Sequence, residues 1–264
     1  MVIEQDLARI YEAIRALAGG SPVALRHVVQ VCREVLAADG AGVRLTDPRG
    51  LGEPAYATDP RAERMLELQI TVGEGPGLTA LRRRFAVLSA GLDEPRRIRQ
   101  WPLFAPAAVD EGIRAMFAFP LSTGAASMGV LEIYRASGRT LSDPELDLAL
   151  TMGQVTTGHL LDKVARTAAG EADAMLDEEL YHRWRTVHHA TGTLVAQLGC
   201  PVTEALLRLR AHAYVTGRRL SEVADDVTAG VLRLPSDQHD DREKNDSEDR
   251  RDEDDGGEGR RRTE

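Results

Sequence analysis

The chain has 264 residues, of which 42% are hydrophobic, and its formal net charge is -9. This length and apolar content are sufficient for two ordinary domains, each with its own core. Residues 1–17 mix acidic with apolar side chains, so we expect neither a signal peptide nor a membrane span, and a cytoplasmic location. The two cysteines, Cys32 and Cys200, lie far apart and give neither a metal cluster nor a disulfide framework.

The negative charge is concentrated at the C-terminus. Residues 236–264 hold thirteen Asp or Glu and seven Lys or Arg, a net charge of -6, and no apolar side chain. Residues 1–235 therefore carry only -3. A segment of this composition cannot bury a core, so we predict a disordered charged tail over 235–264. The acidic total does not exclude a nucleic-acid-binding face on the remaining body.

The first half of the chain predicts an α+β domain. Helices are expected over 2–18 and 23–38, with a break at "GGSP" between them. Alternating residues and turn signals then predict strands over 41–47, 56–59, 85–89, 115–122 and 128–135, with helices over 60–69 and 78–83 on either side of the turn "GEGPG" at 73–77. We therefore expect an antiparallel sheet with flanking helices over 22–140, preceded by an N-terminal helix within 1–21.

A long helix is predicted to begin at "SDPE", which places Ser142 at the cap, Pro in the first turn and Glu three residues after the Ser. It forms a helical connector over 141–173. Apolar and small residues recur along it at spacings of four and three: Leu146, Leu150, Gly153, Thr157, Leu160 and Val164. A second seam runs through Leu176, Leu180, Trp184, Val187, Thr191, Leu194 and Leu198. Such seams favour a homodimer, although a helix lying on its own sheet gives the same stripe.

Three further helices are predicted over 174–198, 202–215 and 219–232, in a domain over 174–234. Short linkers, "GCP" and "TGR", require these helices to pack closely. On a helical wheel, one arc of the second helix is apolar and consists of Val202, Ala205, Leu206, Leu209 and Ala213. The opposite arc holds Thr203, Leu207, Arg210 and Tyr214.

The C-terminal helices resemble the ANTAR domain, a three-helix RNA-binding module of bacterial antiterminators. The matching residues are Ala190, Gly192, Leu198, Gly199, Glu204, Ala205, Leu209, Arg210, Ala213, Leu220, Val223 and Ala224. Residues 22–140, with "GEGPG" and "MGVLEIYR", resemble a GAF domain, and the two in this order are similar to the GAF-ANTAR regulators of actinobacteria. The family often has Ser as the cap of the second helix, where this chain has Pro201, which leaves Cys200 or the backbone as the cap. The resemblance implies binding to paired stem-loops in nascent RNA, which prevents a terminator from forming.

Unpaired RNA bases stack on aromatic side chains or guanidinium planes, and arginines contact phosphates. Arg210 and Tyr214, one turn apart, suit these roles. We predict an RNA-binding set that joins them to nearby basic residues and to one flank of the first of the three helices: Arg185, His189, Gly192, Arg208, Arg210, His212, Tyr214, Arg218 and Arg219. In the alternative, Tyr214 packs on a neighbouring helix, the arginines form a solvated face, and Gly192 allows close helix packing.

Apolar strand residues of the first domain point toward an interior in which GAF-like domains hold small ligands. They are Val43, Leu45, Phe117, Phe119 and Val130, and they suit either an uncharged or weakly polar ligand or a simple core. No haem, bilin or metal ligand set is evident, so we expect no cofactor. We expect no catalytic residue either. A GAF-like reductase of free methionine sulfoxide would need two cysteines together, whereas Cys32 and Cys200 lie in different predicted domains.

The sequence therefore predicts a signal-responsive regulator rather than an enzyme. It would bind RNA and act by transcription antitermination on stem-loops in nascent transcripts. The alternative is a ligand-sensing or protein-interaction scaffold whose C-terminal helices bind a partner protein. Salt-dependent binding with a preference for stem-loops would favour the first, and a stable protein partner without RNA binding would favour the second.

Overall fold

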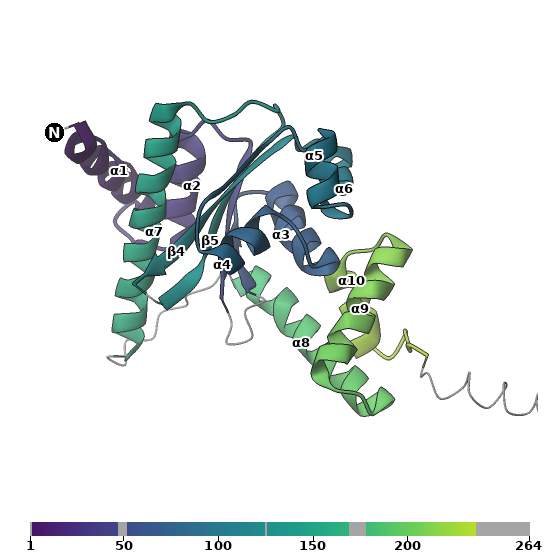
Figure 1. Ribbon diagram of the computed structural model, residues 1–264. Helices are drawn as coiled ribbons and strands as arrows, with labels where there is room; N and C mark the ends of the chain where they lie inside the picture. Colours follow the sequence, from purple (N-terminus) through teal and green to yellow (C-terminus); the bar gives the residue numbers. More distant parts are fainter. Residues whose placement is uncertain (1, 47–51, 125, 169–177, 236–264) are drawn as a thin grey trace, which may run out of the picture.

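The computed structural model describes residues 2–46, 52–124, 126–168 and 178–235 (Figure 1). A five-stranded antiparallel sheet with helices on both faces is followed by a helical C-terminal region, which confirms the predicted α+β class. The elements in chain order are α1 (Val2–Ala18), α2 (Leu25–Val35), β1 (Gly40–Leu45), β2 (Glu53–Ala57), α3 (Pro60–Val72), α4 (Pro76–Arg83), β3 (Val87–Ala90), α5 (Pro95–Gln100), α6 (Phe104–Asp110), β4 (Ala115–Thr123), β5 (Ala126–Arg135), α7 (Asp143–Ala168), α8 (Glu178–Leu198), α9 (Val202–Thr216) and α10 (Leu220–Thr228). The predicted tail beyond Pro235 lies outside the described residues. No helix of the described part is long and apolar enough to cross a membrane.

The sheet has the strand order β2-β1-β5-β4-β3, with every neighbouring pair antiparallel. Side chains of the central strand β5 alternate between its two faces. Leu131 and Ile133 belong to one hydrophobic cluster, and Val130 and Tyr134 to the other. Because β5 is buried on both faces, the sheet requires a helical layer on each side.

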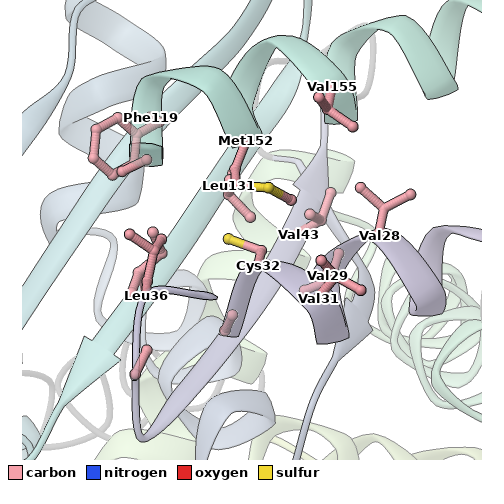
Figure 2. Packing of buried hydrophobic residues seen from close by; sticks show 14 of the residues in the cluster. Val28, Val29, Val31, Cys32, Leu36, Val43, Phe119, Leu131, Met152 and Val155 are labelled. Atoms are coloured by element: carbon pink, nitrogen blue, oxygen red, sulfur yellow. The ribbon is translucent and has the colours of Figure 1, made fainter. Parts of the chain in front are cut away.

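Helices α1, α2 and α7 cover the first face (Figure 1). Figure 2 shows Cys32 of α2 and Met152 of α7 packed close to Val43 of the sheet. Burial raises the pKa of the Cys32 thiol to about 12, so the thiol stays protonated at neutral pH and is a poor nucleophile. This face is a close-packed core.

Helices α3, α4, α5 and α6 lie on the second face, around Met65, Phe104 and Met116. Neither α5 nor α6 was among the predicted elements. Helix α3 begins where Asp59 accepts hydrogen bonds from the backbone nitrogens of Arg61 and Ala62, at 2.9 and 3.0 Å, and ends at Gly73, whose φ is +77°. It is three residues longer than predicted at its C-terminal end.

Helix α7 divides the seam that the sequence predicts. Gly153 and Leu160 are buried toward the protein's own core, as expected for a helix lying on its sheet. The side chains of Leu150, Leu161 and Val164 are 45%, 40% and 46% exposed. Leu150 and Val164 belong to the predicted seam and Leu161 does not, so the seam is divided between the core and an exposed stripe.

Candidate RNA interface

The C-terminal module consists of α8, α9 and α10 around a core of its own. Its buried residues are Trp184, Val187, Ala190, Leu194, Ala205, Leu209, Ala213, Leu220, Val223, Ala224 and Val227. Most of the apolar arc predicted for α9 is in this core. Val202, the first residue of α9, is an exception, since it lies outside the core cluster and is exposed.

The ends of α9 are fixed by the backbone. Pro201 stands at the N-cap in an extended conformation, and its carbonyl oxygen accepts the backbone N–H groups of Glu204 and Ala205 at 3.0 Å. At the other end Gly217 adopts φ +64°, which stops the helix and turns the chain toward α10. The departure at Pro201 therefore leaves the second helix of the module in place.

One flank of α8 is open. Arg185, His189 and Gly192 are all exposed and follow one another at spacings of four and three along the helix. Outside the backbone of its own helix, a Cβ atom built on Gly192 would meet no heavy atom of the described residues within 4 Å, so no helix of the described part packs closely against this glycine. It leaves room for the backbone of a binding partner.

A second exposed group lies on α9 and the turn after it. The side chain of Tyr214 is 46% exposed and that of His212 is partly buried. Arg218 Nη1 lies 2.7 Å from Asp226 Oδ2, and Arg208 Nη2 lies 2.7 Å from Glu204 Oε1. Ion pairs at such exposure contribute about 0–1 kcal/mol, so a phosphate can replace the carboxylate at little cost.

Two of the predicted arginines, both partly buried, contact the N-terminal domain. Arg210 Nε donates a hydrogen bond of 3.1 Å to the carbonyl oxygen of Thr71, in the last turn of α3. Burial lowers the pKa of this guanidinium. Arg219 makes ion pairs with Glu63 and with Glu67 Oε2, the latter at 2.6 Å from its Nη2. These partners on α3 could not be predicted from the sequence pattern.

A cavity of about 250 Å³ lies where the module meets α3 and α6. Tyr214, Arg218 and Arg219 line it from the module, and Met65 and Leu68 from α3. Within the described part of the predicted set, the α8 flank and the surface at Tyr214 and Arg218 are exposed, while Arg210 and Arg219 are held by α3. These contacts do not test RNA binding, so the RNA-binding set stays a prediction.

The residues predicted to line a ligand pocket do not share one face of the sheet. Val43, Phe117 and Phe119 belong to the core between the sheet, α2 and α7, with Leu45 packed against it, and Figure 2 shows Val43 and Phe119 in this packing. Val130 belongs to the cluster on the opposite face. Among the described residues, no group of three or more His, Cys, Asp or Glu is placed to hold a metal ion.

Both parts of the chain match known domain families. A GAF domain model matches residues 22–157, just over half of the chain, and an ANTAR domain model matches residues 176–227. No protein with curated annotation matches the chain. GAF domains sense signals and ANTAR domains are RNA-binding antiterminators; neither is typically catalytic.

Solved structures similar to this chain include two GAF domains of phosphoenolpyruvate-protein phosphotransferases. The one from Acinetobacter is 17% identical, with a TM-score of 0.46, and covers 65% of this chain and 99% of its own. The one from Coxiella burnetii is 16% identical, with a TM-score of 0.47, and covers 62% and 98%. A GAF domain/HD domain protein from Geobacter sulfurreducens is 13% identical, with a TM-score of 0.40, and covers 54% and 95%. From the two domain matches, the chain belongs to the GAF domain family and carries an ANTAR domain as its C-terminal helical module.

Proposed function

We propose that this protein is a cytoplasmic, signal-responsive regulator that binds stem-loops in nascent RNA and acts by transcription antitermination. The observation that carries the proposal is Tyr214, an aromatic side chain that is 46% exposed on the ANTAR helix that also bears Arg208 and Arg210. An exposed aromatic ring beside guanidinium groups suits an unpaired base next to its phosphate. The exposed Arg185 on α8 supplies a further positive charge.

Replacing Tyr214 with alanine is expected to weaken stem-loop binding by about 5- to 150-fold, because stacking on one base is worth about 1–3 kcal/mol. Tyr214→Phe keeps the ring and should keep most of the affinity. Arg185→Ala should instead reduce the slope of log affinity against log salt by about one unit, as the loss of one phosphate contact does. Fluorescence anisotropy of a labelled tandem stem-loop RNA, repeated at several salt concentrations, measures all three variants.

Circular dichroism provides the folding control for these variants. Tyr214 and Arg185 are both outside the buried core of the module, so each variant should melt close to the wild type. If folded Tyr214→Ala and Arg185→Ala both retain wild-type affinity and salt dependence, the RNA-binding residues lie elsewhere and our assignment is wrong.

We also propose that the protein is a homodimer that uses the exposed stripe Leu150, Leu161 and Val164 of α7. Leu161→Glu should give a monomer, because it places a charge in the middle of an apolar contact between two copies. Light scattering after size exclusion measures the mass. The matched variant Asp162→Glu, beside Leu161 on α7, should stay dimeric; a monomeric wild type would contradict the proposal.

The signal that we propose is a small molecule bound by the GAF domain, of uncharged or weakly polar character. The proposed pocket residues are Val43, Leu45, Phe117, Phe119 and Val130. Four of them are in or against one core, and Val130 is on the other face of the sheet. A thermal-shift screen of metabolites tests this proposal, because a ligand in large excess over its Kd stabilises the protein by about 3 kcal/mol. A broad library without a hit would support a domain that is purely structural.

A further inference from the structure

Helix α3 of the GAF domain is the surface on which the ANTAR module lies. Its Ile70 side chain is only 3% exposed and belongs to the hydrophobic cluster of the module rather than to either cluster of its own domain. His188 of α8 adds a polar contact at 2.6 Å from Glu53 Oε1 on β2. The two domains are therefore joined by specific side-chain contacts in addition to the chain between them.

Carboxylates on the acidic face of α3 bind the Arg219 guanidinium in the way that a phosphate group would bind it. Glu63 and Glu67 stand one turn apart and both contact the guanidinium, with 2.7 Å between Arg219 Nε and Glu67 Oε2. The other oxygen of Glu67, Oε1, accepts the backbone N–H of Ser221 at 2.8 Å, in the first turn of α10. A planar guanidinium and a helix N-terminus are the two groups that proteins use most readily for phosphate.

Arg210 is held by the end of the same helix. The carbonyl oxygen of Thr71 is among the last four of α3, which have no partner within the helix, and it accepts the Arg210 Nε–H. The negative end of the helix dipole favours a cation at this point. Gly73 makes room for the contact, because a Cβ there would collide with Arg210 Nη2.

We infer that α3 is an intramolecular competitor of RNA. Glu63, Glu67 and the Thr71 carbonyl occupy the guanidinium groups of Arg219 and Arg210, which therefore contact RNA phosphates only when the ANTAR module leaves α3. This inference rests on the proposed RNA-binding function and adds its regulation: the GAF domain controls RNA access through the contact that α3 makes. A signal that favours the separated arrangement raises RNA affinity by the coupling between the two equilibria.

The test compares the full-length wild type with the double variant Glu63→Gln/Glu67→Gln. Both substitutions keep the side-chain shape and remove the charge that holds Arg219. Affinity for a tandem stem-loop RNA, measured by fluorescence anisotropy at one low salt concentration, is expected to rise by about 5- to 150-fold, the usual range of such couplings. Asp93→Asn/Glu94→Gln is the matched control. It removes the same charge from the GAF domain at residues that contact Arg114 and Arg96, so it should change affinity far less.

Hydrogen exchange of the wild type, with and without saturating RNA, gives a second measurement that needs no variant. Competition predicts faster exchange in α3, around the buried Ile70, because this helix loses the cover of the ANTAR module when RNA is bound. Equal RNA affinity of the wild type and the Glu63→Gln/Glu67→Gln variant, with unchanged exchange, would overturn the competition and leave RNA binding intact. Absence of RNA binding in both proteins would overturn the proposed function, and with it this regulation.

Discussion

Replacing Glu132 with leucine is expected to destabilise the GAF domain by about 3–5 kcal/mol, because it leaves the buried guanidinium of Arg44 without its carboxylate. Both side chains are fully buried, with 3.5 Å between Arg44 Nε and Glu132 Oε1. Gln69 Nε2 and the Tyr134 hydroxyl also donate to Glu132 Oε2, at 2.5 and 3.2 Å. One carboxylate therefore accepts hydrogen bonds from α3 and β5 and forms an ion pair with β1.

The double variant Arg44→Met/Glu132→Leu is the control, since it removes both charges and keeps an apolar volume. It should recover most of the lost stability, as replacement of a buried ion pair by apolar residues commonly does. Urea denaturation followed by circular dichroism measures the free energy of unfolding of each protein. A double variant as unstable as Glu132→Leu would show that the packing of these side chains, rather than an uncompensated charge, causes the loss.

The Glu132 carboxyl group also makes the stability of the protein depend on pH. Burial raises the pKa of Glu132 from its ordinary value of 4.5, against the opposing effects of Arg44, Gln69 and Tyr134. Between the ordinary and the raised pKa the folded state binds more protons than the unfolded state, so this group's contribution to stability falls as the pH rises through that window. Glu132→Gln lacks this titration. Its stability relative to the wild type should therefore increase as the pH is raised above 4.5.

Sequence reasoning predicted the sheet well, because its strands carry clear alternation. It did not place the strand faces correctly for the ligand pocket, since alternation shows which residues of one strand share a face but not the register with its neighbour. Phe119 pairs with Leu131, so Val130 next to Leu131 must point to the opposite face. The burial of Glu132 beside Arg44 depends on the same register. Gly42 pairs with Glu132, and Arg44, two residues further along β1, lies on the same face.

The short helices α5 and α6 could not be predicted from the hydrophobic periodicity of the sequence. They have six and seven residues, fewer than two full turns, and a period of 3.6 cannot be recognised over that length. Their formation is a tertiary effect. Phe104, Ala105 and Ala108 of α6 are fully buried against the second face of the sheet.

The candidate site shows what a helical wheel can and cannot give. It predicted that Leu209 and Ala213 are buried and that Tyr214 is exposed, because these follow from local geometry alone. It could not predict that Arg210 contacts Thr71, which is 139 residues away in the sequence. Glu63 and Glu67 lie four residues apart in the predicted helix over 60–69, and nothing in the sequence indicates which guanidinium group contacts them.

Leu209→Ala is expected to destabilise the ANTAR module by about 2–5 kcal/mol, the usual cost of a cavity at a buried leucine. Leu209 is fully buried in the module core, whereas Leu207, two residues earlier on α9, is 58% exposed. Leu207→Ala is therefore the matched control, and it should stay within about 0.5 kcal/mol of the wild type. The two variants delete the same atoms from the same helix and differ in the face that they affect.

Trp184 reports on this module selectively. The chain has two tryptophans, and Trp184 lies in the module core while Trp101 lies in the GAF domain. In a Trp101→Phe background, urea denaturation followed by fluorescence therefore measures the unfolding of the module. The apparent stem-loop affinity should fall for Leu209→Ala in proportion to the fraction of the module that stays folded, and it should stay unchanged for Leu207→Ala. Equal destabilisation by both would mean that α9 is rotated from the orientation described, and the assignment of Tyr214 to the exposed face would be lost with it.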